Sequence, residues 1–391
     1  MNILLINDYL EGGGAEALFR EQFDILQIDF HVERFYAFEH ISDKKISPLS
    51  YIYSTRFREK LKSFLEKRSF DSVILHNYSG ALSPSILDVL YDYKKANRCR
   101  IIYYAHDYHL ISPNRGYCYY EKGKTVNLKA PPSVWNVLFK RLDARGIVYS
   151  LLKKAQWIWA YTVGKKQKVF DLILAPSDFL TQQIKLRYPD MNTQRMYNVC
   201  NSLPFIHPET VKDKSDALRL VYFGRLDPIK GLINFIDAIR NVPVNYSFTI
   251  IGEGEELPLI QARIEQYQLQ HKIAVMPKLS QTDLFAELQH YDVFVLPTLL
   301  YENAPLSVIE AASLGLGLFL SHHGGILEMG KLCNAGHFFN PFDSKDIAFK
   351  LKILYEDFLA DSLPKADLLR LKALFSRETY IRNLRNYLRH E

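Results

Sequence analysis

The chain has 391 residues, of which 48% are hydrophobic and 24% are charged. This composition excludes intrinsic disorder and collagen-like or low-complexity structure, and the length predicts two or three domains. The four cysteines form no CxxC pair, which argues against a disulfide scaffold or a cysteine zinc site and fits a reducing cytosol. The N-terminal residues lack a basic segment and a cleavage site, so no signal peptide is expected.

Positive charge is concentrated in the first half of the chain. Residues 51–200 contain 25 Lys and Arg against 11 Asp and Glu, whereas the whole chain has a net charge of +6. This asymmetry predicts an anionic partner: a membrane surface, a phosphorylated lipid or a nucleic acid. No run reaches about 18 consecutive apolar residues, so any contact with a membrane is expected to be peripheral.

Along the first half, short apolar runs alternate with helical patterns, as in a parallel sheet covered by helices on both faces. Strands are predicted at 2–8, 72–76, 100–105 and 172–175. Helices are predicted at 15–26, at 86–95 and from residue 179, after a turn that can cap it.

The same rhythm starts again after a polar, proline-containing segment at 205–217, which is predicted to be a linker. Strands are predicted at 218–223, 248–251, 273–275, 293–296 and 318–321. Helices are predicted at 231–239, 255–267, 283–290 and 305–314, with further helices to the end of the chain.

The predicted fold class is therefore α/β, with two doubly wound Rossmann-like domains facing a cleft. We expect an N-terminal domain at 1–204, a C-terminal domain at 205–375, and a last helix at 376–391 that packs back on the first domain. Ligands of such sheets bind outside the carboxyl ends of the strands, so residues that follow the predicted strands are the candidates for function.

Two candidate phosphate-binding turns follow strands. The segment 11–16 carries Gly12, Gly13 and Gly14 at a helix start, where backbone amides can approach an anion, although a plain tight turn is equally compatible. Arg225 and Lys230 lie five residues apart at the carboxyl end of strand 218–223, where they can bind a phosphate or simply face solvent.

A third candidate is the segment 301–312, which runs from a strand into a helix through Pro305. The first amides of that helix can hold an anion. Glu302 precedes the helix and Glu310 lies inside it, where each carboxylate can bind ligand hydroxyls. The structural alternatives are a charge that complements the helix dipole for Glu302 and an exposed helix residue for Glu310.

A fourth candidate is His106, which with Asp107 ends the strand at 100–105 and is expected to point into the cleft. A satisfied hydrogen bond or a cap is about as compatible with this position. His76-Asn77 ends another strand at the same edge, where turn formation is the favoured interpretation.

Taken together, these segments resemble the retaining glycosyltransferases of family four, which have GT-B architecture. The resemblance covers most of the chain and is strongest over 218–330. It is carried by these pieces, in order: Gly12-Gly13-Gly14-Ala15-Glu16, His76-Asn77, His106-Asp107, Ala175-Pro176-Ser177, Gly224-Arg225-Leu226-Asp227, Lys230-Gly231, Ile251-Gly252-Glu253-Gly254, and Glu302 with Glu310 seven residues beyond it.

The resemblance implies a role for each matching residue. Arg225 and Lys230 would bind the donor diphosphate, Glu310 the ribose, and Glu302 the hydroxyls of the donor sugar. The remaining donor contacts would come from the backbone of Asn303 and Ala304, the amides of Leu306 and Ser307, and Gly13 and Gly14 of the N-terminal domain. His106 would line the reaction centre, and Lys278 is expected near the base. Pro305 departs from the pattern, since many relatives have glycine there, and it removes one possible amide contact.

The implied activity is a retaining, metal-independent transfer of a hexose from a nucleotide-diphosphate sugar to a saccharide acceptor in cell-surface polysaccharide, lipopolysaccharide or capsule synthesis. The sequence has no Asp-x-Asp motif, so neither a metal nor another cofactor is expected. The alternatives are a non-catalytic sugar-nucleotide-binding protein, a sugar-nucleotide epimerase, and a glycoside hydrolase that uses Glu302 and Glu310 as its carboxylate pair.

The acceptor is predicted to be linked to a polyprenyl diphosphate at the inner face of the cytoplasmic membrane. Residues 122–168 combine eleven Lys and Arg with Trp135, Phe139, Trp157, Trp159 and Tyr161, a pattern typical of helices on an anionic membrane. A core-packing helix with solvated lysines is the alternative. No recognised nucleic-acid-binding motif is present, so a nucleic acid is not expected as a partner.

Overall fold

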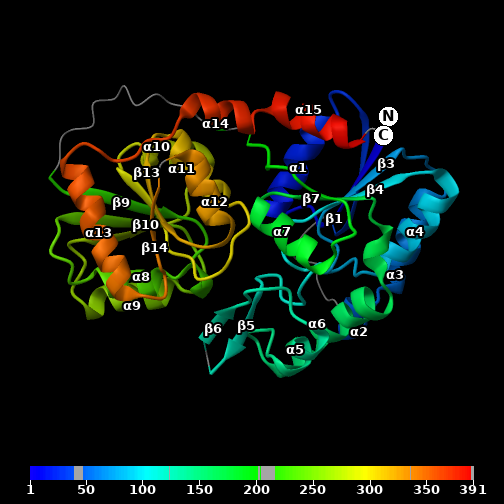
Figure 1. The fold of residues 1–391 in the computed structure, drawn as a ribbon, viewed down its shortest axis with the longest axis horizontal. Helices are drawn as coiled ribbons and strands as arrows, with labels where there is room; N and C mark the ends of the chain where they lie inside the picture. The colour runs from blue at the N-terminus through cyan, green and yellow to red at the C-terminus, as the bar shows by residue number, and fades with distance from the viewer. Residues whose placement is uncertain (39–46, 123, 201–202, 204–215, 335, 389–391) are drawn as a thin grey trace. The chain divides into compact units, whose positions relative to one another are not determined.

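The computed structural model describes residues 1–38, 47–122, 124–200, 203, 216–334 and 336–388 (Figure 1). The chain divides into two compact units: unit 1 comprises residues 1–199 and 375–391, and unit 2 comprises residues 200–374. The predicted boundary between residues 204 and 205 lies outside the described residues, as does the predicted linker up to residue 215.

Unit 1 is built on a six-stranded parallel sheet with the strand order β2-β1-β3-β4-β7-β8. The strands are β1 (Asn2–Tyr9), β2 (His31–Phe38), β3 (Ser72–Leu75), β4 (Arg100–Tyr104), β7 (Leu172–Ala175) and β8 (Thr193–Arg195). The helices around them include α1 (Gly14–Leu26), α3 (Thr55–Leu65), α4 (Ile86–Asn97) and α7 (Asp178–Arg187). The chain places β2 and β3 on opposite sides of β1, so the switch point where ligands bind lies between β1 and β3.

Strand β2 lies at the edge of this sheet and was not expected from the sequence. Among the side chains described for 31–37, Phe35 and Ala37 are buried, while His31, Glu33 and Arg34 keep contact with solvent. The strand therefore lacks the continuous apolar run that marks the central strands, and its pattern is too mixed to recognise.

The last helix of the chain, α15 (Arg377–Leu388), belongs to unit 1. Tyr380, Ile381, Leu384 and Leu388 lie in the same buried cluster as residues of α1 and the central strands. The preceding helix α14 (Leu368–Phe375) ends where unit 1 resumes.

The segment between β4 and β7 forms an addition to the sheet. It contains an antiparallel hairpin of β5 (Cys118–Glu121) and β6 (Lys124–Asn127), then α5 (Val134–Phe139) and α6 (Ile147–Trp157). The prediction that the interleaved aromatic residues face a membrane is wrong for two of them, because Trp157 and Tyr161 are only 0% and 3% exposed. Trp157 donates a hydrogen bond to the carbonyl of His109 at 2.9 Å, which fixes its indole in the core.

Unit 2 contains a second six-stranded parallel sheet with the order β11-β10-β9-β12-β13-β14. The strands are β9 (Leu218–Phe223), β10 (Tyr246–Ile251), β11 (Ile273–Met276), β12 (Val293–Leu296), β13 (Gly317–Ser321) and β14 (Gly336–Phe339). The helices are α8 (Leu232–Ile239), α9 (Leu257–Gln266), α10 (Gln281–Leu288), α11 (Leu306–Ser313), α12 (Gly324–Cys333) and α13 (Ser344–Leu359).

The doubly wound α/β class is therefore confirmed for both units. The helices predicted after residue 321 are present, but β14, which forms one edge of the second sheet, was not predicted. Between β9 and β12 the chain changes direction across the sheet, so the switch point of unit 2 lies at the loops that follow these two strands.

Candidate functional site

The loops after β9 and β12 are locked together at the switch point of unit 2. The carbonyl of Ile229 accepts hydrogen bonds from the Leu299 amide at 2.8 Å and the Thr298 hydroxyl at 3.1 Å. Gly231 has φ +71°, and a Cβ built there would lie 2.3 Å from the Pro297 carbonyl oxygen. Only glycine permits this approach, so the local sequence sets the distance between the two loops.

This docking brings Lys230 and Glu302 together. The ammonium nitrogen of Lys230 lies 2.5 Å from Oε1 of Glu302, and their side chains are only 19% and 22% exposed. The sequence predicted a cation and a hydroxyl-binding carboxylate at these positions but not their pairing, since 72 residues separate them.

Arg225 lies on the same loop as Lys230 and remains accessible. Its side chain is 71% exposed and forms an ion pair with Asp227 at 2.6 Å. The hydroxyl of Tyr222 donates to the Arg225 carbonyl at 2.8 Å, which holds the backbone of this residue at the end of β9. A phosphate can therefore reach the guanidinium group without any rearrangement of the backbone.

A buried carboxyl group beneath this loop was not found from the sequence. Glu256 is 6% exposed, and burial, with the charges of Asp227 and Glu255, raises its pKa to about 7. Its amide donates to the Leu226 carbonyl at 3.0 Å, so it supports the Arg225 loop directly. The run of acidic residues after Gly252 is the only sequence signal for it.

The segment 302–305 is held from the other side by the start of α12. The Gly325 amide donates to the Glu302 carbonyl at 2.8 Å, and a Cβ at Gly325 would lie 1.6 Å from the Asn303 carbonyl oxygen. His323 lies 3.1 Å from the Leu300 carbonyl, and burial lowers the pKa of this histidine to about 4. His323 and Gly325 were also not predicted from the sequence. The glycine pair that follows the predicted strand could have indicated a close approach of two backbones here.

Helix α11 begins one residue later than predicted, because Pro305 is its N-cap and not its first helical residue. Leu306 and Ser307 are thus the first two helical residues, whose amides have no carbonyl partner within the helix. Glu310 lies one turn further on and is half-buried, next to the fully buried Ile309. Asn303 and Ala304 are half-buried in the loop before Pro305.

Lys278 follows β11 at the same edge of the sheet. Its ammonium group lies 3.7 Å from Glu253, in the loop after β10, and both side chains are largely exposed. The candidate positions of unit 2 therefore follow the carboxyl ends of strands, and among them Lys230 and Glu302 form an ion pair.

In unit 1 the glycine turn stands between β1 and α1. Gly13 is the N-cap of α1, and its amide donates to the Glu16 carboxylate at 2.8 Å. A Cβ at Gly14 would meet no heavy atom within 4 Å, and one at Gly13 only Glu16 at 3.8 Å. Close packing therefore does not explain glycine at either position. The two residues instead leave open space next to the turn.

His106 follows β4, as predicted, and contacts a histidine of the neighbouring strand end. Its Nε2 lies 2.7 Å from Nδ1 of His76, which follows the neighbouring strand β3. Burial lowers the pKa of His106 to about 3, so the imidazole is neutral at pH 7. Turn formation, the interpretation favoured for His76-Asn77 from the sequence, therefore does not account for the contact between His76 and His106.

Asp107 takes part in a different cluster with Asp8 and Arg115. The guanidinium group of Arg115 lies 3.6 Å from Asp107 and 3.7 Å from Asp8, and it donates to the Ser79 hydroxyl at 2.6 Å. Asp8 is 1% exposed and accepts amide hydrogen bonds from Gly80 and Leu82, while burial raises its pKa. This cluster was not predicted from the sequence, because Asp8 lies near the end of β1, Ser79 follows β3, and Asp107 and Arg115 follow β4.

Two properties of the described chain bear on metals and membranes. No group of three or more His, Cys, Asp or Glu side chains in the described ranges has the arrangement of a metal site. Within those same ranges, no helix has both the length and the apolar character needed to cross a bilayer.

Comparison with known proteins matches part of this chain to a family. Residues 205–365 match the family described as "Glycosyl transferases group 1". The chain is 28% identical over 152 residues to the putative colanic acid biosynthesis glycosyltransferase WcaL of Escherichia coli K12. That match covers 37% of each chain, so it spans much less than two thirds of the relative.

Solved structures of low sequence identity share the fold over the whole length. Sucrose-phosphate synthase from Thermosynechococcus elongatus superposes with a TM-score of 0.70 at 16% identity, covering 99% of this chain and 98% of its own. The lipopolysaccharide outer core galactosyltransferase WaaB gives 0.67 at 17% identity, with 99% and 98% covered. Residues 205–365 thus match the group 1 glycosyltransferases, and the chain has the GT-B fold.

Proposed function

We propose that this protein is a retaining glycosyltransferase that transfers a hexose from a nucleotide-diphosphate sugar to a saccharide acceptor. The observation that carries the proposal is the ion pair of Lys230 and Glu302 at the switch point of unit 2, four residues before α11 begins. A cation and free amides suit a diphosphate, and an adjacent carboxylate suits sugar hydroxyls.

The difficult step is breakage of the anomeric C–O bond while negative charge develops on the leaving diphosphate. Arg225 and Lys230 would neutralise this charge, aided by the amides of Leu306 and Ser307. One preorganised group of this kind lowers a barrier by roughly 3–4 kcal/mol, and a helix dipole adds about 0.3–2 kcal/mol. We therefore propose a reaction that uses these groups in place of a metal ion.

Glu302 and Glu310 would bind hydroxyl groups rather than act as an acid and a nucleophile. On donor binding, the diphosphate would compete with Glu302 for Lys230 and release the carboxylate toward the sugar, beside the backbone of Asn303 and Ala304. Glu310 would contact the ribose, and Lys278 lies at the edge where the base would be held. Gly13 and Gly14 are also proposed to contact the donor, and a Cβ at Gly14 would meet no heavy atom within 4 Å.

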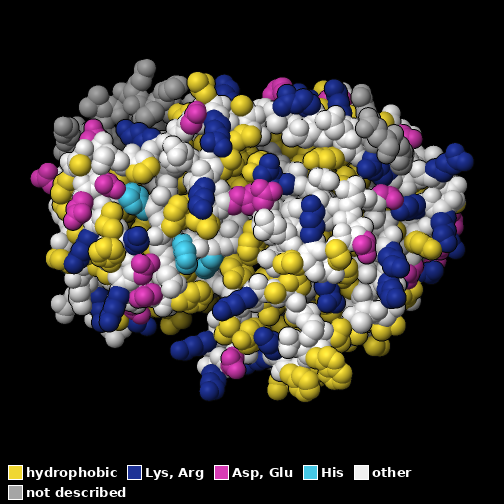
Figure 2. Space-filling view, in the orientation of Figure 1, with side chains coloured by type: hydrophobic (Ala, Val, Ile, Leu, Met, Phe, Trp, Pro, Cys, Tyr) yellow, Lys and Arg dark blue, Asp and Glu magenta, His cyan; other side chains and the backbone are white. Residues whose placement is uncertain are grey.

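The acceptor is proposed to be lipid-linked, with the protein bound to an anionic membrane surface during polysaccharide synthesis. Figure 2 shows hydrophobic side chains gathered over α5 and α6 of unit 1. The exposed large residues there are Trp135, Leu138, Phe139, Ile147, Val148, Tyr149 and Leu151. Arg141 and Arg145 lie between the two helices and are exposed, so the apolar face has basic neighbours, as membrane-surface helices do.

The relatives support a role in surface polysaccharide synthesis. WcaL is named for colanic acid biosynthesis and WaaB for galactosyl transfer to the lipopolysaccharide outer core. By extension, we propose that this chain adds a hexose to a growing surface saccharide.

A donor panel followed by transfer assays tests the function. The protein is screened by thermal shift against UDP-, GDP- and ADP-sugars, and the best binder is incubated with and without polyprenyl-diphosphate-linked saccharide. The proposal expects a product that requires the acceptor and keeps the anomeric configuration. Donor binding without turnover would instead identify a sugar-nucleotide-binding protein, and conversion of the donor without acceptor would identify an epimerase.

A further inference from the structure

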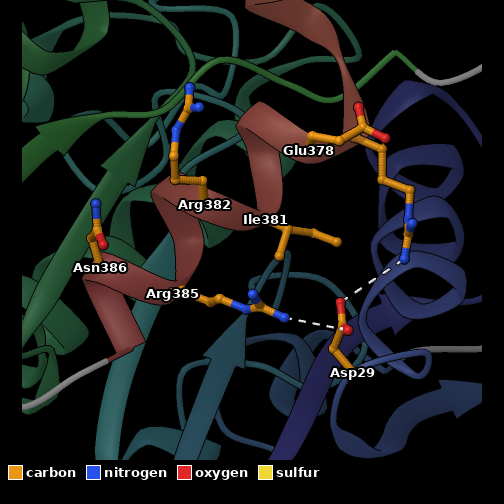
Figure 3. A pocket seen from close by; sticks show the side chains of 7 residues that line it. Asp29, Glu378, Ile381, Arg382, Arg385 and Asn386 are labelled. Carbon is orange, nitrogen blue, oxygen red and sulfur yellow. Dashed lines mark ion pairs between the residues drawn. The ribbon is translucent and has the colours of Figure 1, made fainter.

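Two aspartates of this protein hold arginines in different surroundings. In unit 1, Asp29 lies 3.3 Å from Arg385 and 3.9 Å from Arg377, beside a groove of about 340 Å³ at α15 (Figure 3). The Asp29 side chain is 30% exposed, so water can replace either arginine. In unit 2, Asp227 lies 2.6 Å from Arg225, and its side chain is only 15% exposed. Loss of the arginine would therefore leave a poorly hydrated charge at Asp227.

The inner oxygen of Asp227 relies on this cation. Oδ2 is shielded from solvent, and no group in the described part of the chain donates a hydrogen bond to it, so the charge of Arg225 stabilises it. The Asp227 backbone is fixed, because its carbonyl accepts a hydrogen bond from the Lys230 amide at 2.8 Å. The Arg225 side chain is 71% exposed and can turn toward a ligand. A bound diphosphate can thus take the arginine away while the aspartate stays.

A second carboxyl group, that of Glu256, lies beneath the same loop. Glu256 is 6% exposed, and its Oε2 is shielded from solvent without a hydrogen-bond donor among the residues that the structure describes. It is the N-cap of α9, but its side chain makes no capping hydrogen bond, and Ser, Thr, Asp and Asn are the residues favoured at that position. Helix capping therefore does not explain a buried glutamate here.

The backbone holds Glu256 close to the Arg225 loop. The Leu226 amide donates to the Glu253 carbonyl at 2.9 Å, and the Glu256 amide donates to the Leu226 carbonyl at 3.0 Å. A Cβ built at Gly254 would lie 2.3 Å from the Leu226 carbonyl oxygen, so a side chain at this position would push the two loops apart. Since Asp227 follows Leu226 directly, these contacts keep the two carboxyl-bearing residues in neighbouring positions.

The charges around Glu256 favour its protonated form. Burial is the main cause of its raised pKa of about 7, and the charges of Asp227 and Glu255 raise the pKa further. Tyr222, at the end of β9, is buried beside the same acids, and burial followed by the charges of Glu302, Asp227 and Glu256 raises its pKa. The tyrosine therefore stays neutral at pH 7, whereas Glu256 is close to half protonated.

We propose that Asp227 and Glu256 are positioning residues that couple donor binding to the uptake of a proton. The diphosphate draws the Arg225 guanidinium group away from Asp227, and Glu256 takes a proton from solvent, so that the two carboxyl groups carry one negative charge between them. The proton returns to solvent when the nucleoside diphosphate leaves. This inference rests on the proposed binding of the donor diphosphate by Arg225, and it makes donor affinity depend on a residue that lies beneath the binding loop.

The sign and size of the effect follow from the repulsion between two carboxylates. Loss of the cation at Asp227 raises the pKa of Glu256, because two neighbouring negative charges disfavour each other. A rise of about one unit corresponds to about half a proton taken up per site at pH 7.5. Since the complex then holds more protons than the free protein, the Kd increases with pH, by about fivefold between pH 7 and pH 9. Phosphate groups ionise with a pKa of about 6, so the nucleotide contributes little over that range.

Calorimetry of UDP, GDP and ADP binding to the full-length protein measures this coupling, in Hepes and in Tris, which differ in ionisation enthalpy. The wild type should take up about half a proton at pH 7.5 and bind about fivefold more weakly at pH 9 than at pH 7. Glu256→Gln keeps the size of the side chain but cannot titrate, so it should bind without proton uptake and with the same Kd at both pH values. Glu255→Gln is the matched control, because it removes an exposed acid next in the chain, and it should behave like the wild type.

Asp227→Asn tests the other member of the pair. It removes both the competitor for Arg225 and the charge to which Glu256 responds. The Kd should therefore fall about threefold, and the proton uptake should disappear.

Three results would overturn the inference. The first is wild-type binding without proton uptake, or with the same uptake as Glu256→Gln. The second is an equal loss of uptake in Glu255→Gln, which would show a general effect of acidic charge. The third is uptake that persists in Asp227→Asn, which would show that the two residues do not share the proton.

Arg225→Ala tests the coupling without any nucleotide. Loss of the guanidinium group leaves Asp227 without its cation, as in the proposed donor complex. The Glu256 carboxyl group, followed by ¹³C NMR on glutamate-labelled protein and assigned through Glu256→Gln, should then titrate about one pKa unit higher than in the wild type. An unchanged titration would overturn the coupling. If no nucleoside diphosphate binds the wild type, the proposed donor site is refuted, while this titration still decides whether Arg225 controls the protonation of Glu256.

Discussion

Lys230 and Glu302, 72 residues apart in the chain, form an ion pair of 2.5 Å at the switch point of unit 2. Each is supported by backbone contacts of its own loop: Ile229 with Leu299 on one side, and Glu302 with Gly325 on the other. The pair satisfies both charges while no donor is bound. A diphosphate must therefore compete with Glu302 for the ammonium group, which makes this contact the point where donor affinity is set.

The first prediction separates the two partners. Glu302→Gln removes the competing charge, so the Kd for nucleoside diphosphate should fall about fivefold, equivalent to about 1 kcal/mol for a partly buried pair. Sugar transfer should fall about 100-fold, because the hydroxyl-binding carboxylate is lost. Lys230→Ala should weaken both binding and transfer. Calorimetry with UDP, GDP and ADP, together with the transfer assay, measures these effects.

Lys272→Ala is the control for this pair. Lys272 immediately precedes β11, at the amino end of the sheet, and contacts the Tyr246 ring at 5.0 Å. Its removal should leave nucleotide affinity unchanged. If Glu302→Gln weakens nucleoside diphosphate binding as much as Lys230→Ala does, the competition model is wrong.

The second prediction concerns Arg225. Its guanidinium group is exposed and can bind a phosphate through two parallel hydrogen bonds, so Arg225→Ala should lower kcat/KM about 100-fold. Arg225→Lys should recover only a small part of the lost kcat/KM, because an ammonium group cannot make the bidentate contact. Arg263→Ala, which breaks an ion pair of 2.9 Å with Asp237 elsewhere in unit 2, should transfer sugar at the wild-type rate. Equal losses in the Arg225 and Arg263 variants would refute this assignment.

The third prediction concerns the exposed apolar face of α5. Trp135 and Phe139 are 71% and 84% exposed, and burial of one such side chain in a lipid interface is worth roughly 1.5–3 kcal/mol. The double substitution Trp135→Ser and Phe139→Ser should lower binding to anionic vesicles at least tenfold in a sedimentation assay. Added salt should weaken binding of the wild type, because basic residues contribute.

Leu186→Ser provides the comparison, since Leu186 is an equally exposed residue on α7 of unit 1. Its binding should match that of the wild type. If the wild-type protein stays in the supernatant when anionic vesicles are sedimented, the proposed membrane binding is wrong.

The fourth prediction concerns pH. The pKa of His106 is lowered to about 3 and that of His76 lies well below its usual range, whereas both titrate near 6.5 in the unfolded chain. Between these values the unfolded state binds more protons, so stability is complete above about pH 6.5 and is lost as the pH falls. Each such histidine should lower the free energy of unfolding by up to about 2 kcal/mol between pH 6.5 and 5.

Tryptophan fluorescence reports this loss for unit 1 alone, because all three tryptophans, Trp135, Trp157 and Trp159, belong to it. Urea unfolding at pH 7 and pH 5 should show a smaller pH difference for His76→Asn than for the wild type. The exposed His31 serves as control, and His31→Asn should keep the full difference. The same pH difference in the free energy of unfolding in all three proteins would contradict this assignment to His76.

The sequence predicted the central strands well and the edges of the sheets poorly. Strands such as β1 and β12 are continuous apolar runs because helices cover both of their faces, and that pattern is visible locally. Strand β2 at one edge, β14 at another and the β5–β6 hairpin are partly exposed and mixed in composition, so they were missed. Trp157 and Tyr161 were misplaced for a related reason: composition alone does not tell which face of a helix is buried.

The candidate residues of unit 2 could be predicted from the sequence because the pattern that marks them is also local. Arg225, Lys230 and Glu302 each lie in the loop that follows a predicted strand, and the carboxyl ends of parallel strands meet at one edge of a sheet. Gly325 and Glu256 were overlooked, because their roles depend on which loop packs against them.

By itself, the order of the residues determined that the chain forms two parallel α/β sheets and which short segments stand at their carboxyl edges, because hydrophobic periodicity and turn chemistry act over a few neighbours. Only the tertiary structure decided which distant residues meet: Lys230 with Glu302, His106 with His76, and Tyr380 with Gln22 across 358 positions of the sequence. Such contacts arise from the packing of helices and loops brought together by the whole fold, and no local pattern in the chain encodes them.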